Sequence, residues 1–220
     1  MYIGGLDVGT SGCKISIYDE KGNFICKHYQ EYDSVRGNDI QEIDANALWE
    51  SVKAVIKAAA DEVGKIAAIG VTTFGESFVM LDENDTVLLP AMLYTDKRGN
   101  AECAQFDAKT VMNIGGAQPH GMYSIPKIMW IKKHLPEVYA KIKRIMLMED
   151  YIVYLLSGNS FIDYSMAART MAFDIRKKCW SSEIFEAAGV DPSLLSTPNG
   201  AMFCMILVSV WQFAGYMMLI

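Results

Sequence analysis

Residues 5–25 read GLDVGTSGCKISIYDEKGNFI and place a polar turn between apolar, strand-like runs. The runs at 2–9, 13–19 and 23–32 are rich in Ile, Val, Tyr and Phe, which favour β-strands. The intervening GTSG and DEKGN contain the residues that most often form turns. This stretch therefore predicts two consecutive hairpins, so that a sheet opens with three antiparallel strands.

A helix and a fourth strand follow these hairpins. DANALWESVKAVIKAAADEVG predicts a helix with Asp44 as its N-cap and Gly64 as its end. Its apolar face consists of Leu48, Val52, Val55, Ile56 and Ala59. The continuous apolar run KIAAIGVTT at 65–73 predicts a buried strand. A helix between strands is typical of a parallel crossover, so we predict an α/β domain with a mixed sheet.

The rest of the chain predicts a further hairpin and several helices. The hairpin is expected from SFVMLD at 77–82 and TVLLPAMLY at 86–94. Helices are expected near 97–112, 123–134, 136–142 and 149–156, with a strand at 143–147. Because no repeat or low-complexity linker interrupts this order, residues 1–195 are interpreted as one α/β domain.

Charge and cysteine content narrow the class of protein. The 220 residues carry a formal charge of -6, which gives no net positive field to attract nucleic acid. The five cysteines are scattered, odd in number and form no C-x-x-C pair, which favours free thiols in a reducing cytosol. The N-terminus lacks the pattern of a signal peptide. We therefore expect a cytoplasmic protein that does not bind nucleic acid.

The C-terminal stretch differs from the rest in composition. All 20 Lys and Arg and all 26 Asp and Glu precede residue 201, so AMFCMILVSVWQFAGYMMLI carries no charge. About 20 uncharged residues match the length needed to cross a bilayer, although a buried core segment can be equally apolar. We interpret 196–220 as a hydrophobic tail and keep two alternatives for it, a transmembrane segment with membrane association and a segment packed into the domain.

The first turn contains groups that suit a phosphate. Asp7 ends an apolar strand, where a carboxylate is costly unless solvent or a cation meets it. Donors around it come from the turn and its flank: Gly9, Thr10, Ser11, Gly12 and Lys14. Backbone N–H groups at glycines and hydroxyl donors are typical of loops that bind phosphate together with Mg²⁺. An ordinary hairpin turn remains the alternative.

Five stretches, in this order, resemble the FGGY family of carbohydrate kinases, within the actin/hexokinase-like ATPase superfamily. Residues 5–25 resemble its first phosphate loop, D-x-G-T-S-x-x-K. Residues 69–99 resemble the substrate strand and the W-x-D-x-R segment, with Tyr94 in place of Trp. The other three stretches are 125–158, with its K-x-x-W and P-E pattern, 162–180, with IDYSMAARTMAFD, and 181–195. The resemblance implies a ribonuclease-H-like N-terminal domain.

The resemblance also implies ATP-dependent phosphorylation of a ketose or polyol, with ATP and Mg²⁺ as cofactors. Asp7 would hold Mg²⁺ through water, and four residues would lie along the path of the γ-phosphate: Gly9, Thr10, Ser11 and Lys14. Glu76 would point at the sugar, supported by Asp96, Arg98 and Asp163. As alternatives, Asp96 and Arg98 would form a surface charge pair and Glu76 would be a solvated loop carboxylate.

Departures from the family pattern limit what the resemblance implies. Residues 75–76 read Gly-Glu, whereas glycerol kinases carry Arg-Glu and xylulokinases Met-His, so the sugar or polyol is not identified. The family's catalytic aspartate, in a G-D-Q-like segment, and its ATP-binding C-terminal domain have no counterpart in this sequence. We therefore expect a truncated kinase that is inactive alone and is completed by a separate C-terminal half. The alternative is a non-catalytic sugar-binding or membrane-associated remnant.

Overall fold

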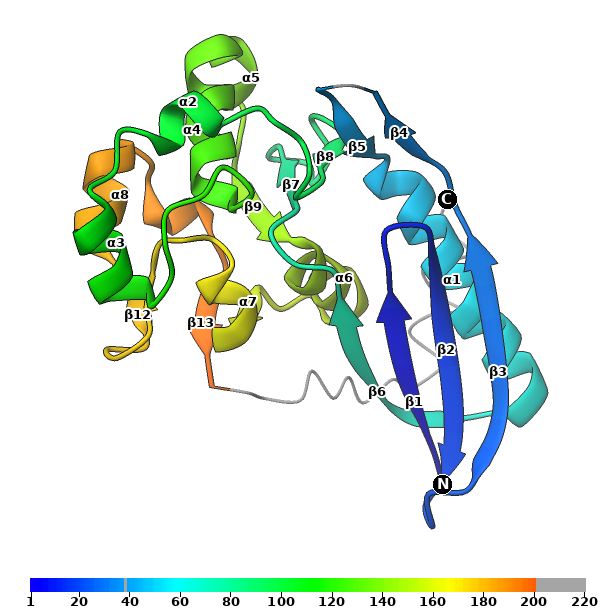
Figure 1. Ribbon diagram of the computed structural model, residues 1–220. Coiled ribbons are helices and arrows are strands. Elements are labelled where there is room, and N and C mark those ends of the chain that lie inside the picture. Colours follow the sequence, from blue (N-terminus) through cyan, green and yellow to red (C-terminus); the bar gives the residue numbers. More distant parts are fainter. Residues whose placement is uncertain (38, 201–220) are drawn as a thin grey trace.

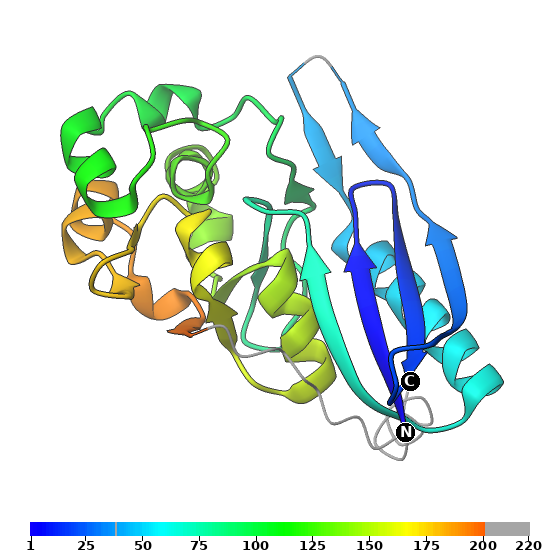
Figure 2. The same ribbon diagram turned by 60° about the horizontal axis from the view of Figure 1, so that its bottom comes forward.

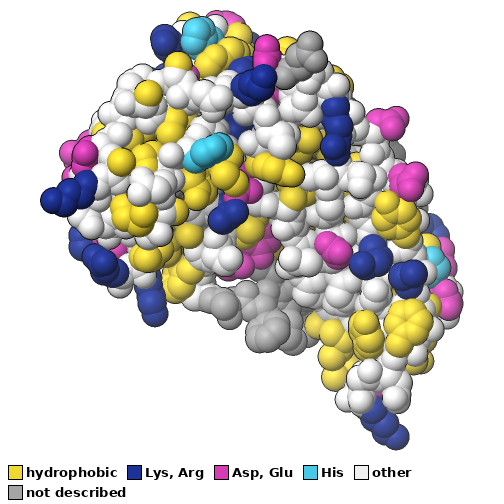
Figure 3. Space-filling model, viewed as in Figure 1, with side chains coloured by type: hydrophobic (Ala, Val, Ile, Leu, Met, Phe, Trp, Pro, Cys, Tyr) yellow, Lys and Arg dark blue, Asp and Glu magenta, His cyan; other side chains and the backbone are white. Residues whose placement is uncertain are grey.

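The computed structural model describes residues 1–37 and 39–200, which form two lobes (Figures 1 and 3). The first lobe is a four-stranded sheet in the order β3-β2-β1-β6, with a long helix along one face (Figures 1 and 2). Its elements are β1 (Tyr2–Val8), β2 (Gly12–Asp19), β3 (Phe24–Glu31), α1 (Ala45–Val63) and β6 (Ile66–Thr73). The mixed sheet and its opening hairpins confirm the fold predicted from the sequence.

The register of β1 places the first turn beside the end of β6. β1 pairs antiparallel with β2, so that Asp7 lies opposite Lys14. β1 also pairs parallel with β6, where Asp7 lies opposite Thr72 and Val8 opposite Thr73. Carboxyl ends of parallel strands meet at the same edge of a sheet. The polar turn and the segment after β6 are therefore neighbours.

Helix α1 begins and ends as the sequence predicts. The Asp44 side chain accepts hydrogen bonds from the backbone N–H of Asn46 at 2.8 Å and of Ala47 at 3.3 Å, which satisfies donors at the helix start. Gly64 adopts a φ of 79°, which is strained for residues with a Cβ, and its N–H donates to Ala60 O. The predicted apolar face is buried against β2 and β3: Leu48, Val52, Val55, Ile56 and Ala59.

The second lobe contains most of the helices and several short strands. In chain order its elements are β7 (Phe78–Leu81), α2 (Asn100–Cys103), α3 (Ala108–Gly115), α4 (Ser124–His134), α5 (Pro136–Tyr139), β9 (Arg144–Leu147), α6 (Met148–Ser157), β10 (Phe161–Asp163), α7 (Tyr164–Ala168), β11 (Phe173–Asp174), β12 (Cys179–Trp180), α8 (Ser182–Ala188), a 3₁₀ turn (Pro192–Leu194) and β13 (Thr197–Asn199). The helix expected near 97–112 is two helices, because the Asp107 side chain caps a new one by accepting from Thr110 N.

The hairpin predicted from 77–82 and 86–94 forms only at its turn. A single bridge joins Leu81 to Val87, and β7 instead pairs antiparallel with β9. Pro90 has no N–H to donate, so it interrupts the second run as a strand. Beyond it, β8 (Ala91–Met92) pairs with β5 (Gln41–Ile43), which also pairs with β4 (Ser34–Arg36).

The β7–β9 pair separates two hydrophobic cores. Val79 and Leu81 of β7 belong to the core that α1 and the large sheet share. Phe78 and Met80 belong to the core formed with the helices of the second lobe. Successive side chains of a strand point to opposite faces, so one short strand serves both cores. Because the β7–β9 pair is packed on both faces, it fixes the orientation of the segment between β6 and β7.

The ordered chain continues past residue 195, where the sequence placed the end of the domain. β13 pairs parallel with β10, and Ser196 is buried. Residues 196–199 therefore belong to the described fold rather than to the predicted tail. Residues 201–220, to which the membrane and core alternatives apply, lie outside the described residues. Within 1–37 and 39–200, no helix has the length and apolarity required to cross a membrane.

Candidate functional site

The turn between β1 and β2 offers two backbone donors. Gly9 N donates to Gly12 O at 2.9 Å, so the Gly9 N–H is occupied, contrary to the sequence interpretation. Thr10 N and Ser11 N make no hydrogen bond to the described part of the chain. The hydroxyl of Tyr32, the residue after β3, donates to Gly9 O and so connects the turn to the end of that strand. Adjacent free N–H groups, together with the Thr10 and Ser11 hydroxyls, suit an anion.

Asp7 and Lys14 place opposite charges beside this turn. Lys14 Nζ lies 3.3 Å from Asp7 Oδ2, and their side chains are 42% and 55% exposed. An exposed pair at this distance is weak, since water competes for both groups. The Asp7 carboxylate is therefore accessible to a further cation without loss of a buried contact.

Glu76 sits in a strained turn directly after β6. Its φ of 64° is unusual for a residue with a Cβ. Ser77 N donates to Gly75 O at 2.7 Å, which makes Glu76 the central residue of a γ-turn of the rare kind. The residue is nevertheless 4% exposed. Strained conformations of this kind persist where surrounding structure fixes them and are frequent at functional sites.

A guanidinium group covers Glu76. Arg169, which follows α7, forms an ion pair with the Glu76 carboxylate and packs over Gly75. Burial raises the pKa of Glu76, and the charge and hydrogen bond of Arg169 act against that rise. Glu76 is therefore not the solvated loop carboxylate that the sequence left open as an alternative.

Lys127 is a buried cation that the sequence interpretation missed. It lies on α4, is fully buried, and its Nζ donates to Gly121 O at 2.6 Å and Met122 O at 3.1 Å. Burial lowers its pKa to about 8, and the charges of Asp96 and Glu76 oppose that fall. The two carbonyls hold the amine in place, and both carboxylates are near enough for their charges to act on it. The signal was the first position of the K-x-x-W pattern at 127–130.

Asp96 and Arg98 form a buried bridge rather than a surface pair. Arg98 Nη2 lies 2.6 Å from both Asp96 Oδ2 and Glu42 Oε1, and Gln41 N donates to Asp96 at 2.8 Å. Burial would raise the pKa of Asp96, but hydrogen bonds from Arg98 and Gln41 N outweigh it and lower the pKa. Trp130 stacks on this guanidinium, whose carbon lies 5.4 Å from the ring centroid.

Asp163 has a structural contact of its own. Its side chain accepts from Met166 N at 2.7 Å and so caps α7, the short helix that precedes Arg169. Burial, and after it the charge of Asp163, raises the pKa of Glu149 to about 8. Asp163 thus positions α7, whereas no contact joins it to Glu76 or Asp96.

Ion pairs and the effects of nearby charges relate the remaining site residues to one another. We call Glu76, Asp96, Arg98, Lys127 and Arg169 the polar cluster. The Asp7 turn and Glu76 follow neighbouring parallel strands, and the charges of Glu76 and Asp96 both act on Lys127. Arg169 was also missed by sequence reasoning, and its signal was the AART of the 162–180 stretch. The Asp7 turn and Glu76 therefore share one edge of the large sheet.

We expect Glu149→Gln to stabilise the protein more at pH 8 than at pH 5. Folding raises the pKa of Glu149 from 4.5 to about 8, so the carboxyl is neutral in the fold. Between pH 4.5 and 8, Glu149 is ionised in the unfolded chain but protonated in the fold. The free energy of unfolding therefore falls as pH rises. The neutral amide removes that disadvantage, which a pKa change from 4.5 to about 8 makes about 4 kcal/mol at pH 8 and about 1 kcal/mol at pH 5.

Urea unfolding at both pH values measures this difference. Glu186→Gln, which changes an exposed carboxylate of α8, is the matched control and should give no pH-dependent change. An equal effect of Glu149→Gln at pH 5 and pH 8 would show that the buried carboxyl is ionised in the fold.

Comparison with known proteins identifies this architecture. A xylulose kinase of Lactococcus lactis is 32% identical over 202 residues, covering 88% of this chain and 40% of the relative. A glycerol kinase of Thermococcus onnurineus is 28% identical over 212 residues, covering 88% and 42%. The crystal structure of a xyloylose kinase from Brucella ovis superposes with a TM-score of 0.86 at 27% identity, covering 90% of this chain and 43% of that one.

The chain thus spans about two fifths of the length of the curated relatives it matches. The profile of the FGGY family of carbohydrate kinases, N-terminal domain, matches residues 2–203. This match covers most of the chain and includes the Asp7 turn and the whole polar cluster. The chain belongs to the FGGY family of carbohydrate kinases.

Proposed function

We propose that this chain provides the sugar-binding and phosphate-binding half of a kinase that transfers the γ-phosphoryl group of ATP to a hydroxyl of a ketose or polyol. The observation that carries the proposal is the shared sheet edge, where the Asp7 turn and Glu76 follow the paired parallel strands β1 and β6. Phosphoryl transfer depends mainly on placing the phosphate beside the acceptor hydroxyl. A donor turn beside a buried carboxylate supports that placement.

The Asp7 turn fits Mg²⁺ and the terminal phosphate of ATP. Mg²⁺ keeps several waters and binds through one or two carboxylates and phosphate oxygens, which matches a single, half-exposed Asp7. When bound, Mg²⁺ neutralises charge on the phosphate oxygens. Thr10 N and Ser11 N would donate to that phosphate, Gly9 would allow its close approach, and Lys14 would add positive charge.

The polar cluster fits a substrate with several hydroxyl groups. Glu76 would accept from a hydroxyl, and Arg169 would hold the carboxylate in the buried turn. Gly75 has no side chain and leaves room for Arg169. A guanidinium therefore reaches Glu76 from the end of α7, whereas the Arg-Glu pattern of glycerol kinases places an Arg next to the Glu in the sequence. Asp96 and Arg98 would support the same cluster, and Asp163 would act indirectly, by capping the helix α7 that precedes Arg169.

Turnover requires a base and an adenine site, which the resemblance assigns to a C-terminal half. We therefore propose that the full reaction uses such a half as a partner. The test is release of ADP from ATP and Mg²⁺ over a panel of ketoses and polyols. The 220-residue chain is assayed alone and together with the C-terminal half of the L. lactis relative. Turnover with at least one sugar in the mixture is expected, whereas absence of turnover throughout would favour a non-catalytic, sugar-binding role.

We expect Glu76→Gln to raise the KM for the sugar about 10–100-fold, because a hydrogen bond from a hydroxyl to a charged carboxylate contributes about 1.5–3 kcal/mol. The KM for ATP should stay within about twofold, since Glu76 is assigned to the acceptor. Steady-state ADP release measures both constants. Glu83→Gln, in the exposed turn after β7, is the control. Equal increases in both KM values would place Glu76 outside the acceptor pocket.

A further inference from the structure

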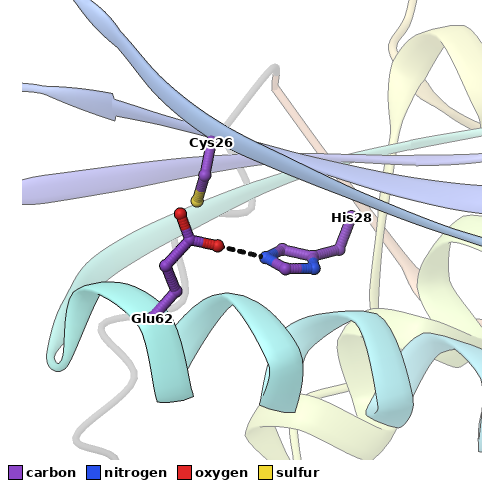
Figure 4. A group of neighbouring side chains, drawn as sticks. All are labelled: Cys26, His28 and Glu62. Carbon is purple, nitrogen blue, oxygen red and sulfur yellow. Dashed lines mark hydrogen bonds and ion pairs between the residues drawn. The ribbon is translucent and has the colours of Figure 1, made fainter.

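Three potential metal ligands meet on the face of the sheet that α1 covers. Cys26 and His28 alternate along β3, so their side chains share one face. Glu62 lies in the last turn of α1 and points at both of them (Figure 4). One ligand atom from each side chain lies within 4.8 Å of the other two, and His28 Nε2 is 2.9 Å from Glu62 Oε2.

The chemistry of this set is that of a zinc site. Thiolate, imidazole and carboxylate are ligands that Zn²⁺ accepts together, whereas Mg²⁺ and Ca²⁺ prefer oxygen ligands alone. In a tetrahedral zinc site with bonds of about 2.0–2.3 Å, ligand atoms lie about 3.3–3.8 Å apart. The three ligand atoms here lie within 4.8 Å of one another. Rotation of the Glu62 and His28 side chains, which are 52% and 28% exposed, can bring these atoms to the separations of a zinc site.

We propose that Cys26, His28 and Glu62 bind one Zn²⁺ ion, with water in the fourth position. The Cys26 sulfur enters from the buried side, and the solvent side is open at Glu62. The C-terminal end of α1 carries partial negative charge, which favours a cation there. The proton of the thiol is released to solvent when the metal binds.

The bound ion would connect two elements that do not share backbone hydrogen bonds. β3 pairs only with β2 within the described sheet, and α1 packs across both strands. A metal bond between β3 and the end of α1 would secure this outer strand. The site lies on a different part of the sheet from the Asp7 turn, so it is a structural site rather than part of phosphoryl transfer.

Titration of the metal-stripped 220-residue chain with Co²⁺ and then Zn²⁺ tests the proposal. One equivalent of Co²⁺ should produce a thiolate charge-transfer band and the intense visible bands of tetrahedral cobalt, and Zn²⁺ should displace it. His28→Gln and Glu62→Gln should each weaken Zn²⁺ binding by at least about 100-fold, because each removes one of three protein ligands. Both side chains reach solvent, so both variants should fold.

Two cysteine variants distinguish the site from adventitious thiol binding. Cys26→Ala should abolish the charge-transfer band, whereas Cys179→Ala, at an exposed free cysteine, should leave it unchanged. Zn²⁺ should also raise the Tm of the wild type but not that of His28→Gln. An octahedral cobalt spectrum, a band that survives Cys26→Ala, or no binding by the wild type would overturn the proposal.

Discussion

Asp7→Asn is expected to lower phosphoryl transfer by about a thousandfold or more, measured as ADP release from the chain mixed with a C-terminal kinase half. The carboxylate is the group that would hold Mg²⁺ beside the terminal phosphate, and an amide carries no charge for that task. The fold should be little affected, because the Asp7–Lys14 pair is exposed and contributes less than about 1 kcal/mol. The loss should therefore appear in kcat without a change in unfolding midpoint.

Asp61→Asn is the matched control for this experiment. Asp61 is also an exposed aspartate paired with a lysine, Lys57, but it lies on the surface of α1. Its substitution should leave ADP release unchanged. If Asp7→Asn retained more than about a tenth of the wild-type kcat, the Asp7 turn would not be the site of Mg²⁺ and phosphate binding.

Asp96→Ala is expected to destabilise the protein by about 3–5 kcal/mol. The Asp96 carboxylate accepts from Gln41 N and from Arg98, and is 2% exposed. Its removal leaves a largely buried guanidinium with Glu42 as its remaining carboxylate partner, and it removes the acceptor of the Gln41 N–H in β5. Because whole domains are stable by only about 5–15 kcal/mol, this loss is large. Urea unfolding at pH 7 measures it.

Asp39→Ala provides the comparison within the same segment. Asp39 pairs with Lys97 at 2.8 Å, but the two side chains are 73% and 61% exposed. That variant should lose less than about 1 kcal/mol. Asp96→Asn, which keeps the shape and loses the charge, should fall between the two alanine variants. Equal effects of Asp39→Ala and Asp96→Ala would contradict the buried bridge.

The first lobe could be predicted because its strands and its helix are determined by patterns within short stretches of sequence. The alternation of 2–32, the N-cap at Asp44 and the stop at Gly64 each act over a few residues, and the structure follows them. The hairpin at 77–94 was wrong because the partner of β7 is β9, more than sixty residues later in the chain. Pairing at that separation depends on the packing of both cores, which no short window contains.

Site residues that belong to a recognised motif could be predicted from the sequence. Residues whose importance depends on their burial or on distant neighbours could not. The D-x-G-T-S-x-x-K pattern located the Asp7 turn, and the structure places it beside Glu76. The occupied Gly9 N–H could not be anticipated, since it depends on how the turn closes. Lys127 was missed because an isolated Lys in a sequence is most often exposed, whereas here it is fully buried. Arg169 is 44% exposed and was missed because its partner, Glu76, is distant from it in the sequence. Their importance follows from neighbours that only folding supplies.

Calorimetric titration of the 220-residue chain with a panel of ketoses and polyols, without ATP, tests whether the polar cluster binds the acceptor. At least one of these compounds should bind in a 1:1 complex. Glu76→Gln should weaken that binding about 10–100-fold, while Asp7→Asn should leave it unchanged within about twofold. If no compound binds, or if Glu76→Gln binds as tightly as the wild type, the polar cluster is not a sugar site.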